Sequence, residues 1–379
     1  MHTSPSIFST LLLAGLVLPS VCLQGGPLEF APPMLEPSPF TLWDVSLTLR
    51  GSGGHKDNPT YAGNRFREPS SFAGLGADLT VFRLPTDGNH FFFTFSGDDR
   101  RYFDALDARK EQTFLSLAQF QHETGDWLWS LTGQHFFADQ VLDLSDQSLG
   151  RGFARAAGHN LSLLPALRRQ LGDQWWLEAG INLARQYYGG VLDDYWESAP
   201  RLTLGKTYGH RSSLEFSLSS SHRTPDHSAL FNASGGILPG SHEELTVSGL
   251  DFVWGHYWDA GRHWRTRLKG AAQQHRDNGE GYEDFDRLYA SAELLFELGR
   301  WRASLSGSYK LVSYAVQPGD VGEMGSRRRE EIDVEARLEY QLRPKLKLIL
   351  DGELERSFAN TSSDIYTART VSLGLEWEL

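Results

Sequence analysis

The most constraining feature of this chain is a two-faced strand pattern that recurs along most of its length. The last nine residues show it clearly, because Val371, Leu373, Leu375, Trp377 and Leu379 alternate with small or charged residues. Successive side chains of a β-strand point to opposite faces, so this segment has one apolar face and one polar face. A chain made of such strands forms a sheet that shields only one of its two faces from water.

The same alternation appears at 177–183, 214–218, 290–296 and 332–340. A soluble β-sandwich would show it as well. Mean hydropathy is −0.39, and no internal segment has the roughly 20 continuous apolar residues of a membrane-spanning helix. The sequence therefore excludes a helical membrane protein. A membrane β-barrel stays possible, because only one face of each strand has to be apolar.

Short and long connections between these strands alternate along the chain. The short turns carry Gly or Pro, as hairpins require, at 85–89, 123–126, 171–173, 208–210, 259–262, 298–300 and 343–345. The long connections are expected at 51–71, 98–112, 138–153, 188–195, 222–243, 275–284, 313–328 and 357–365. Strict alternation of the two kinds joins sixteen strands and leaves both ends of the sheet on the short-turn side.

This rhythm predicts an all-β fold: a 16-stranded antiparallel up-and-down transmembrane β-barrel over residues 40–379. The soluble competitor is a four-bladed propeller, which also has sixteen strands in a meander. Propeller blades use shorter strands, and they do not sort their loops by length and side. The barrel is therefore the favoured interpretation.

Aromatic residues support the barrel because indole and phenol rings prefer the membrane interface. We expect an interface belt beside the short turns, made of Trp43, Trp129, Trp175, Trp254, Trp264, Trp301 and Trp377. A second belt is expected beside the long loops, made of Tyr102, Phe136, Phe137, Tyr187, Tyr188, Tyr195, Tyr282, Tyr314, Phe358 and Tyr366.

With its sixteen two-faced strands and the closing strand Val371, Leu373, Leu375, Trp377, Leu379, the chain resembles bacterial outer-membrane barrels of the porin and exporter type. The resemblance covers residues 40–379. It implies the outer membrane of a Gram-negative bacterium, with membrane lipid and lipopolysaccharide around the barrel. It also implies insertion by the barrel-assembly machinery, which reads the closing strand. A terminal Phe or Trp is usual in that group, whereas this chain ends in Leu379 with Trp377 two residues earlier.

Two segments precede the expected barrel. Residues 1–24 have the apolar run of a secretory signal peptide, although the positive charge before that run is missing. Residues 25–39 are rich in Pro and are expected to form an extended periplasmic leader. Cys22 is the only cysteine, so the chain contains no disulfide. Lipidation of Cys22 stays open, although Val21 is bulkier than the small residue preferred before a lipidated cysteine.

A 16-stranded barrel leaves an aqueous lumen, so its inward side chains tune passage. The alternation assigns charged residues of the C-terminal half to this lumen: Arg265, Arg267, Lys269, Glu293, Glu297, Arg302, Asp333, Glu335, Arg337, Glu339, Lys345, Lys347, Glu353 and Glu355. Either these residues stiffen a wetted wall by pairing across strands, or they set a transverse field that selects solutes. The loops at 51–71 and 222–243 either fold inward and narrow the pore or pack on neighbouring loops.

Other chemistry is weakly indicated. The net charge of −12 argues against nucleic acid as a partner. No catalytic motif occurs, and we expect no enzyme activity, no cofactor and no metal. A lipid-facing hydrolase built from Ser, His and an acid stays open as an alternative. His222, His227 and His242 share one loop without the spacing of a metal site. The acidic segment 277–284 does not match a calcium-binding loop.

The sequence thus predicts a passive outer-membrane channel for small polar solutes or saccharides. One alternative is a barrel that exports a polysaccharide or a lipoprotein. Another is a non-conducting surface barrel whose loops bind a partner. Conductance separates the first possibility from the last.

Overall fold

The computed structural model describes residues 42–61, 68–105, 108–143, 153–189, 192–209, 211–320 and 325–379. The expected signal peptide, the Pro-rich leader and Cys22 lie outside these ranges. No helix within them is long and apolar enough to cross a membrane. The described residues form sixteen strands and one short 3-10 helix, η2 (Ser362–Asp364).

The strands are 13 to 18 residues long. Their bounds are β1 (Trp43–Lys56), β2 (Ser70–Thr86), β3 (Asn89–Tyr102), β4 (Lys110–Thr124), β5 (Trp127–Asp143), β6 (Phe153–Gln170), β7 (Trp175–Gly189) and β8 (Tyr195–Tyr208). The second half comprises β9 (Ser212–Pro225), β10 (Leu245–Tyr257), β11 (Trp264–Asp277), β12 (Phe285–Leu298), β13 (Trp301–Pro318), β14 (Ser326–Arg343), β15 (Leu346–Ala359) and β16 (Tyr366–Glu378).

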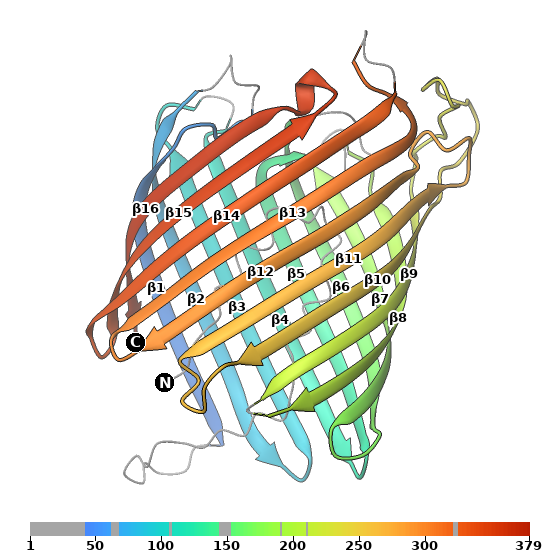
Figure 1. Cartoon of the computed structure of the whole chain (residues 1–379). Helices are drawn as coiled ribbons and strands as arrows, with labels where there is room; N and C mark the ends of the chain where they lie inside the picture. The colour runs from blue at the N-terminus through green and yellow to red at the C-terminus, as the bar shows by residue number, and fades with distance from the viewer. Residues whose placement is uncertain are drawn as a thin grey trace.

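Each strand pairs in antiparallel fashion with its sequence neighbours, and β16 pairs with β1 to close the barrel (Figure 1). The closing register places Leu49 opposite Trp377 and Gly53 opposite Leu373. Closure leaves no edge strand with unpaired backbone groups, which a membrane interior requires. The predicted 16-stranded up-and-down barrel is confirmed.

The hairpin between β2 and β3 shows how sequence dictates a short turn. Asp87 and Gly88 are the only residues between the two strands, and both have positive φ, 53° and 75°. This is the backbone of a tight hairpin turn, which Asp-Gly adopts readily. Pro85 belongs to the end of β2, beside a register shift between Arg83 and Thr86.

The long connections are shorter in the structure than the sequence predicts, because the strands extend further. For example, β13 continues to Pro318 and β14 begins at Ser326, although 313–328 was expected to be a loop. Strands of this length exceed the nine to eleven residues that a tilted strand needs to cross a bilayer. The extra residues, such as 326–331 of β14, are polar on both faces, so the alternation disappears where the strand leaves the membrane.

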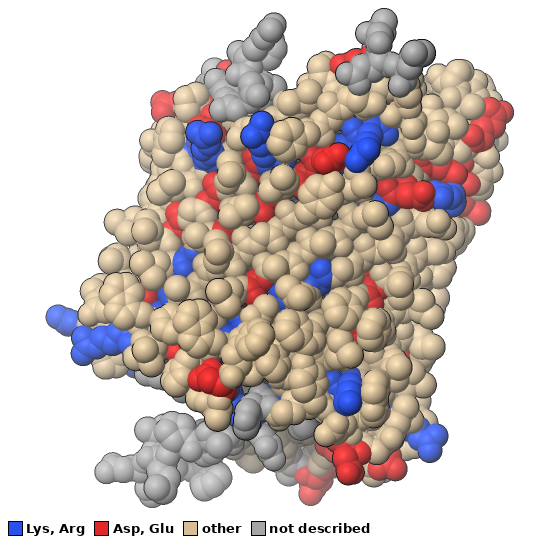
Figure 2. All heavy atoms as spheres, viewed as in Figure 1, with Lys and Arg blue, Asp and Glu red and all other residues tan. Residues whose placement is uncertain are grey.

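The outer face of the barrel carries the apolar residues of the alternating pattern. Leu75, Val371 and Leu373 expose 74%, 59% and 55% of their surface. In the view of Figure 2, the middle of the outer surface is mostly uncharged, and most acidic and basic side chains lie toward the two ends. An apolar band of this kind is the lipid-facing surface of a transmembrane barrel.

The tryptophans predicted for the short-turn belt lie on this outer face, whereas Trp176, also beside a short turn, is 6% exposed and lies on the inner face. The exposed ones are Trp43, Trp129, Trp175, Trp264, Trp301 and Trp377. Trp254 also points outward, and its indole N–H donates to the Tyr208 hydroxyl at 2.6 Å. Basic side chains cover several of these rings, with Arg83 over Trp43, Arg169 over Trp127 and Lys206 over Trp175. This arrangement suits an interface where cations reach toward lipid headgroups.

The prediction of a second aromatic belt at the membrane interface is mostly wrong. Tyr102, Phe136, Tyr195, Tyr314 and Tyr366 are buried, with exposures of 2 to 6%. By strand register they belong to the inner face, whereas Phe358 and Tyr187 point outward. The sequence places these rings at the correct end of the strands. It does not place them on the correct face, because the polar strand ends blur the alternation.

Candidate functional site: the charged inner wall

Register fixes which side chains face the inside of the barrel. On β11, Arg265, Arg267 and Lys269 occupy alternate positions on the face opposite to exposed Trp264. Their neighbours across the sheet on β12 are Leu295, Glu293 and Ser291. The three basic side chains therefore form one stripe on the inner face, and we call it the basic stripe.

Four carboxylates form a second stripe on β14 and β15. Asp333 lies directly opposite Glu355, and Glu335 lies directly opposite Glu353. Like charges at directly opposite cross-strand positions are destabilising. A wall with a purely structural role would avoid this cost. We call these four residues the acidic stripe.

Ion pairs neutralise some of the inner charges. Arg337 contacts Glu339 at 2.8 Å and Asp351 at 3.3 Å. Lys347 contacts Glu376 at 2.8 Å. Between the described residues, by contrast, no ion pair engages Arg265 or Lys269 on the basic stripe.

Two of the four residues of the acidic stripe also lie outside these ion pairs. No ion pair with another described residue engages Asp333 or Glu353, and one carboxylate oxygen of Asp333 is buried without a hydrogen-bond partner. Arg265 and Lys269 on one stripe, and Asp333 and Glu353 on the other, therefore lie outside the ion pairs between described residues, and β12 and β13 separate the two stripes. This arrangement favours the transverse-field interpretation over simple stiffening of the wall.

The remaining predicted lumen residues separate into three groups. Glu297 and Arg302 are half-buried inner-face neighbours across β12 and β13. Glu339 and Glu355 are also on the inner face but are 8% and 2% exposed, so they are packed among partners and not open to the lumen. Lys345 does not lie on the wall. It is exposed in the turn between β14 and β15, because Pro344 and Lys345 form that turn.

The opposite part of the inner face is uncharged. Its inward positions are Thr113–Gln121 on β4, Leu128–Gln140 on β5 and Ala156–Ala166 on β6, and none of them is charged. Amides and hydroxyls pair across strands here, as in Gln119 to Thr132 at 3.0 Å and Asn160 to Gln186 at 3.1 Å. We call this region the neutral wall and the inner face of β11–β15 the charged wall.

At the long-loop end, a buried hydrogen-bonded group ties distant strands together. The Lys56 ammonium lies 3.6 Å from Glu111 on β4 and 3.8 Å from Glu355 on β15. It also donates to the Tyr61 hydroxyl at 2.9 Å, and that hydroxyl donates to Glu355 at 3.1 Å. We call Lys56, Tyr61, Glu111 and Glu355 the tether. It joins strands that are separated by β16, β1, β2 and β3.

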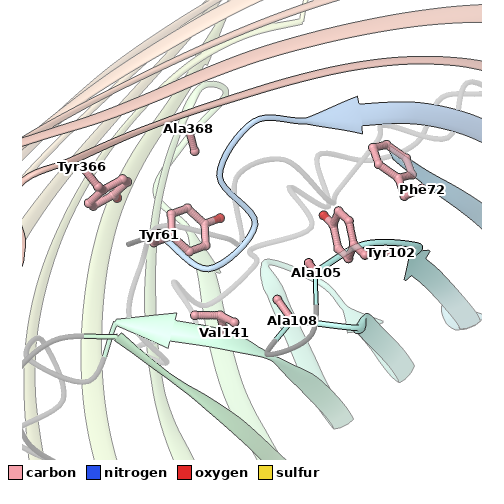
Figure 3. Close-up of a cluster of buried hydrophobic side chains, with 8 residues drawn as sticks. All are labelled: Tyr61, Phe72, Tyr102, Ala105, Ala108, Val141, Tyr366 and Ala368. Atoms are coloured by element: carbon pink, nitrogen blue, oxygen red, sulfur yellow. The ribbon is translucent and has the colours of Figure 1, made fainter. Parts of the chain in front are cut away.

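The tether sits beside a cluster of buried aromatic rings. Tyr61 packs edge-on against Tyr366, with ring centroids 5.2 Å apart, and Phe72 packs similarly against Tyr102 (Figure 3). Residues 57–61 follow β1 and bring Tyr61 to the inner side of the barrel. The first part of the connection expected at 51–71 therefore does fold inward. Lys56 and Tyr61 were not predicted as site residues, because both fall in the connection expected at 51–71.

The other long connection packs on its neighbour. Phe231 and Tyr282 lie 5.4 Å apart, and the backbone N–H of Ala233 donates to Glu280. The loop at 226–244 is thereby held to the loop at 278–284, which confirms the packing alternative. The Asp277 carboxylate holds the second loop by accepting hydrogen bonds from the backbone N–H groups of Gly279 and Glu283.

A buried carboxyl lies between these two loops. Glu243 is 3% exposed. Burial, together with the nearby carboxylates of Glu283 and Asp277, raises its pKa to about 8. The contact between the loops therefore contains an acid that is protonated at neutral pH.

The histidines of the loop at 222–243 lie beside carboxylates. Across the described ranges, no group of three or more His, Cys, Asp or Glu side chains is arranged to hold a metal ion. His227 instead pairs with Asp193 at 3.2 Å, and His222 lies 3.9 Å from Glu244.

Comparisons with known proteins give only architectural likeness. No protein-family model and no curated protein matches the chain. OccAB1 of Acinetobacter baumannii aligns with 11% identity and a TM-score of 0.48, over 89% of this chain and 96% of that one. OprD of Pseudomonas aeruginosa aligns with 11% identity and a TM-score of 0.46, over 89% and 95%. A bacterial polysaccharide outer membrane secretin aligns with 9% identity and a TM-score of 0.43, over 88% and 98%.

The location of the chain is decided by its own surface, a closed even-numbered barrel with an apolar outer face and a polar inner face. This chain is an outer-membrane β-barrel. The structural similarities above do not identify the solute or other molecule that the barrel carries, so function has to be argued from the inner wall.

Proposed function

We propose that this barrel is a passive channel for small polar solutes. The observation that carries the proposal is a set of opposite charges on the charged wall that lie outside the ion pairs between described residues, Arg265 and Lys269 on β11 and Asp333 and Glu353 on β14–β15. Charged rings and stripes that line a water-filled pore select permeating ions and solutes. A wall that only had to be wetted would pair these charges, as Arg337 and Lys347 are paired.

In this proposal the solute passes through the channel without any covalent change. The facing amides of the neutral wall give a solute hydrogen-bonding partners, and the stripes orient its dipole. The residues proposed to line the path are Arg265, Arg267, Lys269, Glu293, Glu297, Arg302, Asp333, Glu335, Arg337, Lys347 and Glu353, with Glu339 and Glu355 as buried supports.

The test is planar-bilayer recording of the purified, folded barrel. We expect unitary currents, and we expect exchange of Arg265, Arg267 and Lys269 for Glu to shift the reversal potential in a KCl gradient toward cation selectivity. Absence of unitary current would remove the channel proposal, and an unchanged reversal potential would show that the basic stripe does not line the path.

A matched control exchanges three basic residues of the outer face. Arg83, Arg169 and Lys206 lie over tryptophans beside the short turns. Their replacement by Glu should leave selectivity close to that of the parent. Heat-modifiable migration in semi-native gels verifies that both triple variants are folded.

A further inference from the structure

A groove crosses the outer face of the barrel over β3–β8. Its floor is made of small residues, with Ala118 directly opposite Gly133 and Ser116 directly opposite His135. A Cβ atom added at Gly133 would meet nothing within 4 Å. Gly133 lines the groove, and a larger side chain there would project into it.

Mostly apolar side chains form the sides of the groove, which is also lined by Arg185, itself ion-paired with Asp226. Phe93 lies on one side, and Leu161, Leu163 and Leu183 lie on the other. Leu163 and Leu183 are 45% and 43% exposed. Most of this lining is apolar and faces lipid, so this part of the groove matches a hydrocarbon chain in chemistry and in its position on the barrel.

A group of charges lies on the same face, toward the long loops. Lys110 and Arg155 both contact the single carboxylate of Asp139, at 2.6 Å and 2.8 Å. Two cations that share one carboxylate leave a net positive charge. We call these three residues the outer cation cluster.

The spacing of the two features suits a lipid. Asp139 follows His135 by four residues on β5, which places the cluster about 13 Å from the groove at the usual rise of a strand. Long loops of such barrels are extracellular, so the cluster lies at the headgroup level of the outer leaflet. The lipid of that leaflet in Gram-negative bacteria is lipopolysaccharide, which carries several acyl chains on a phosphorylated sugar.

We propose that the groove holds one acyl chain of a lipopolysaccharide molecule whose phosphate contacts the outer cation cluster. Charge-assisted hydrogen bonds from Lys110 and Arg155 recognise the phosphate. A second copy of the chain fits less well, because a two-fold contact across this face would bring two positive clusters together. The proposal concerns the outer face and does not depend on conduction through the lumen.

The experiment measures lipid retention by native mass spectrometry of the full barrel after detergent exchange. The probe is bisphosphorylated hexa-acylated lipid A, compared with dephosphorylated lipid A and with phosphatidylglycerol. We expect one bisphosphorylated lipid A per barrel. Gly133→Leu fills the floor of the groove and should reduce retention at least tenfold. Lys110→Gln with Arg155→Gln should reduce retention of the bisphosphorylated lipid to that of the dephosphorylated one.

Gly51 provides the matched control. It also lies on the outer face, on β1, and a Cβ atom added there meets nothing within 4 Å. Gly51→Leu should retain lipid A like the parent, and both Leu variants should keep the parent's unitary current and heat-modifiable migration.

Three outcomes would overturn the proposal. The first is equal retention by the Gly133→Leu and Gly51→Leu variants. The second is retention of phosphatidylglycerol as strong as that of lipid A. The third is an oligomer in the parent that Gly133→Leu dissociates, which would assign the groove to a second copy.

Discussion

The charged wall and the neutral wall share one backbone architecture and differ in the chemistry of their inner faces. Both consist of long antiparallel strands with apolar outer positions. On the neutral wall, inner amides and hydroxyls pair across strands, as in Gln119 with Thr132 and Asn160 with Gln186. The charged wall keeps opposed carboxylates, and its Arg265 and Lys269 lie outside the ion pairs between described residues. The lipid dictates only the outer face, so the inner face is free to carry function.

The largest expected effect comes from removing the acidic stripe. Asp333→Asn with Glu353→Gln should move the reversal potential in a KCl gradient toward anion selectivity, opposite to the basic-stripe variant. Two unit charges 4 Å apart in water interact with an energy of about 1 kcal/mol. Removing one wall charge beside a permeating ion should therefore change the permeability ratio several-fold. The same measurement on Gln119→Ala, on the neutral wall, should show almost no change. Equal shifts from the two walls would remove the distinction between them.

The tether is the next point at which the comparison can be tested, because it joins Glu111 beside the neutral wall to Glu355 on the charged wall. Tyr61→Phe removes the hydroxyl that accepts from Lys56 and donates to Glu355. Leaving buried partners unsatisfied costs about 2 kcal/mol. We expect a lower temperature for the heat-modifiable gel shift and a larger, noisier unitary current. A current identical to the parent's would show that the tether does not restrict the mouth.

The smallest effect concerns pH and the contact between the loops at 226–244 and 278–284. An acid whose pKa rises from 4.5 to about 8 on folding keeps a proton that the unfolded chain releases. The free energy of unfolding therefore falls as the pH rises between these two values, and it stops changing above about pH 8. Hydrogen exchange in 226–244, corrected for intrinsic rates, should accelerate from pH 6 to pH 9. Glu243→Gln should abolish this change, whereas Glu244→Gln should preserve it. A parent loop whose corrected exchange does not vary with pH would contradict the assignment.

Charge patterns were predictable from sequence only where alternation was intact. The basic stripe, Asp333, Glu335 and Glu353 were assigned to the inner face from their spacing, and register places them there. Lys345 was wrongly predicted to face the lumen, because the alternating pattern of β15 was extended one step too far, into the turn that precedes this strand. The second aromatic belt was misplaced because polar residues occupy both faces of the strand ends outside the membrane.

The sequence by itself determined the number of strands, their order and the two-faced character of each, because side-chain alternation and turn chemistry are local properties. Tertiary structure decided what depends on register around the closed sheet. Lys56 reaches both Glu111 and Glu355 only because β16 closes on β1. Likewise, Gly133 becomes the floor of a groove only because Ala118, Leu163 and their neighbours are aligned beside it. Such contacts join residues far apart in the chain, and no local pattern encodes them.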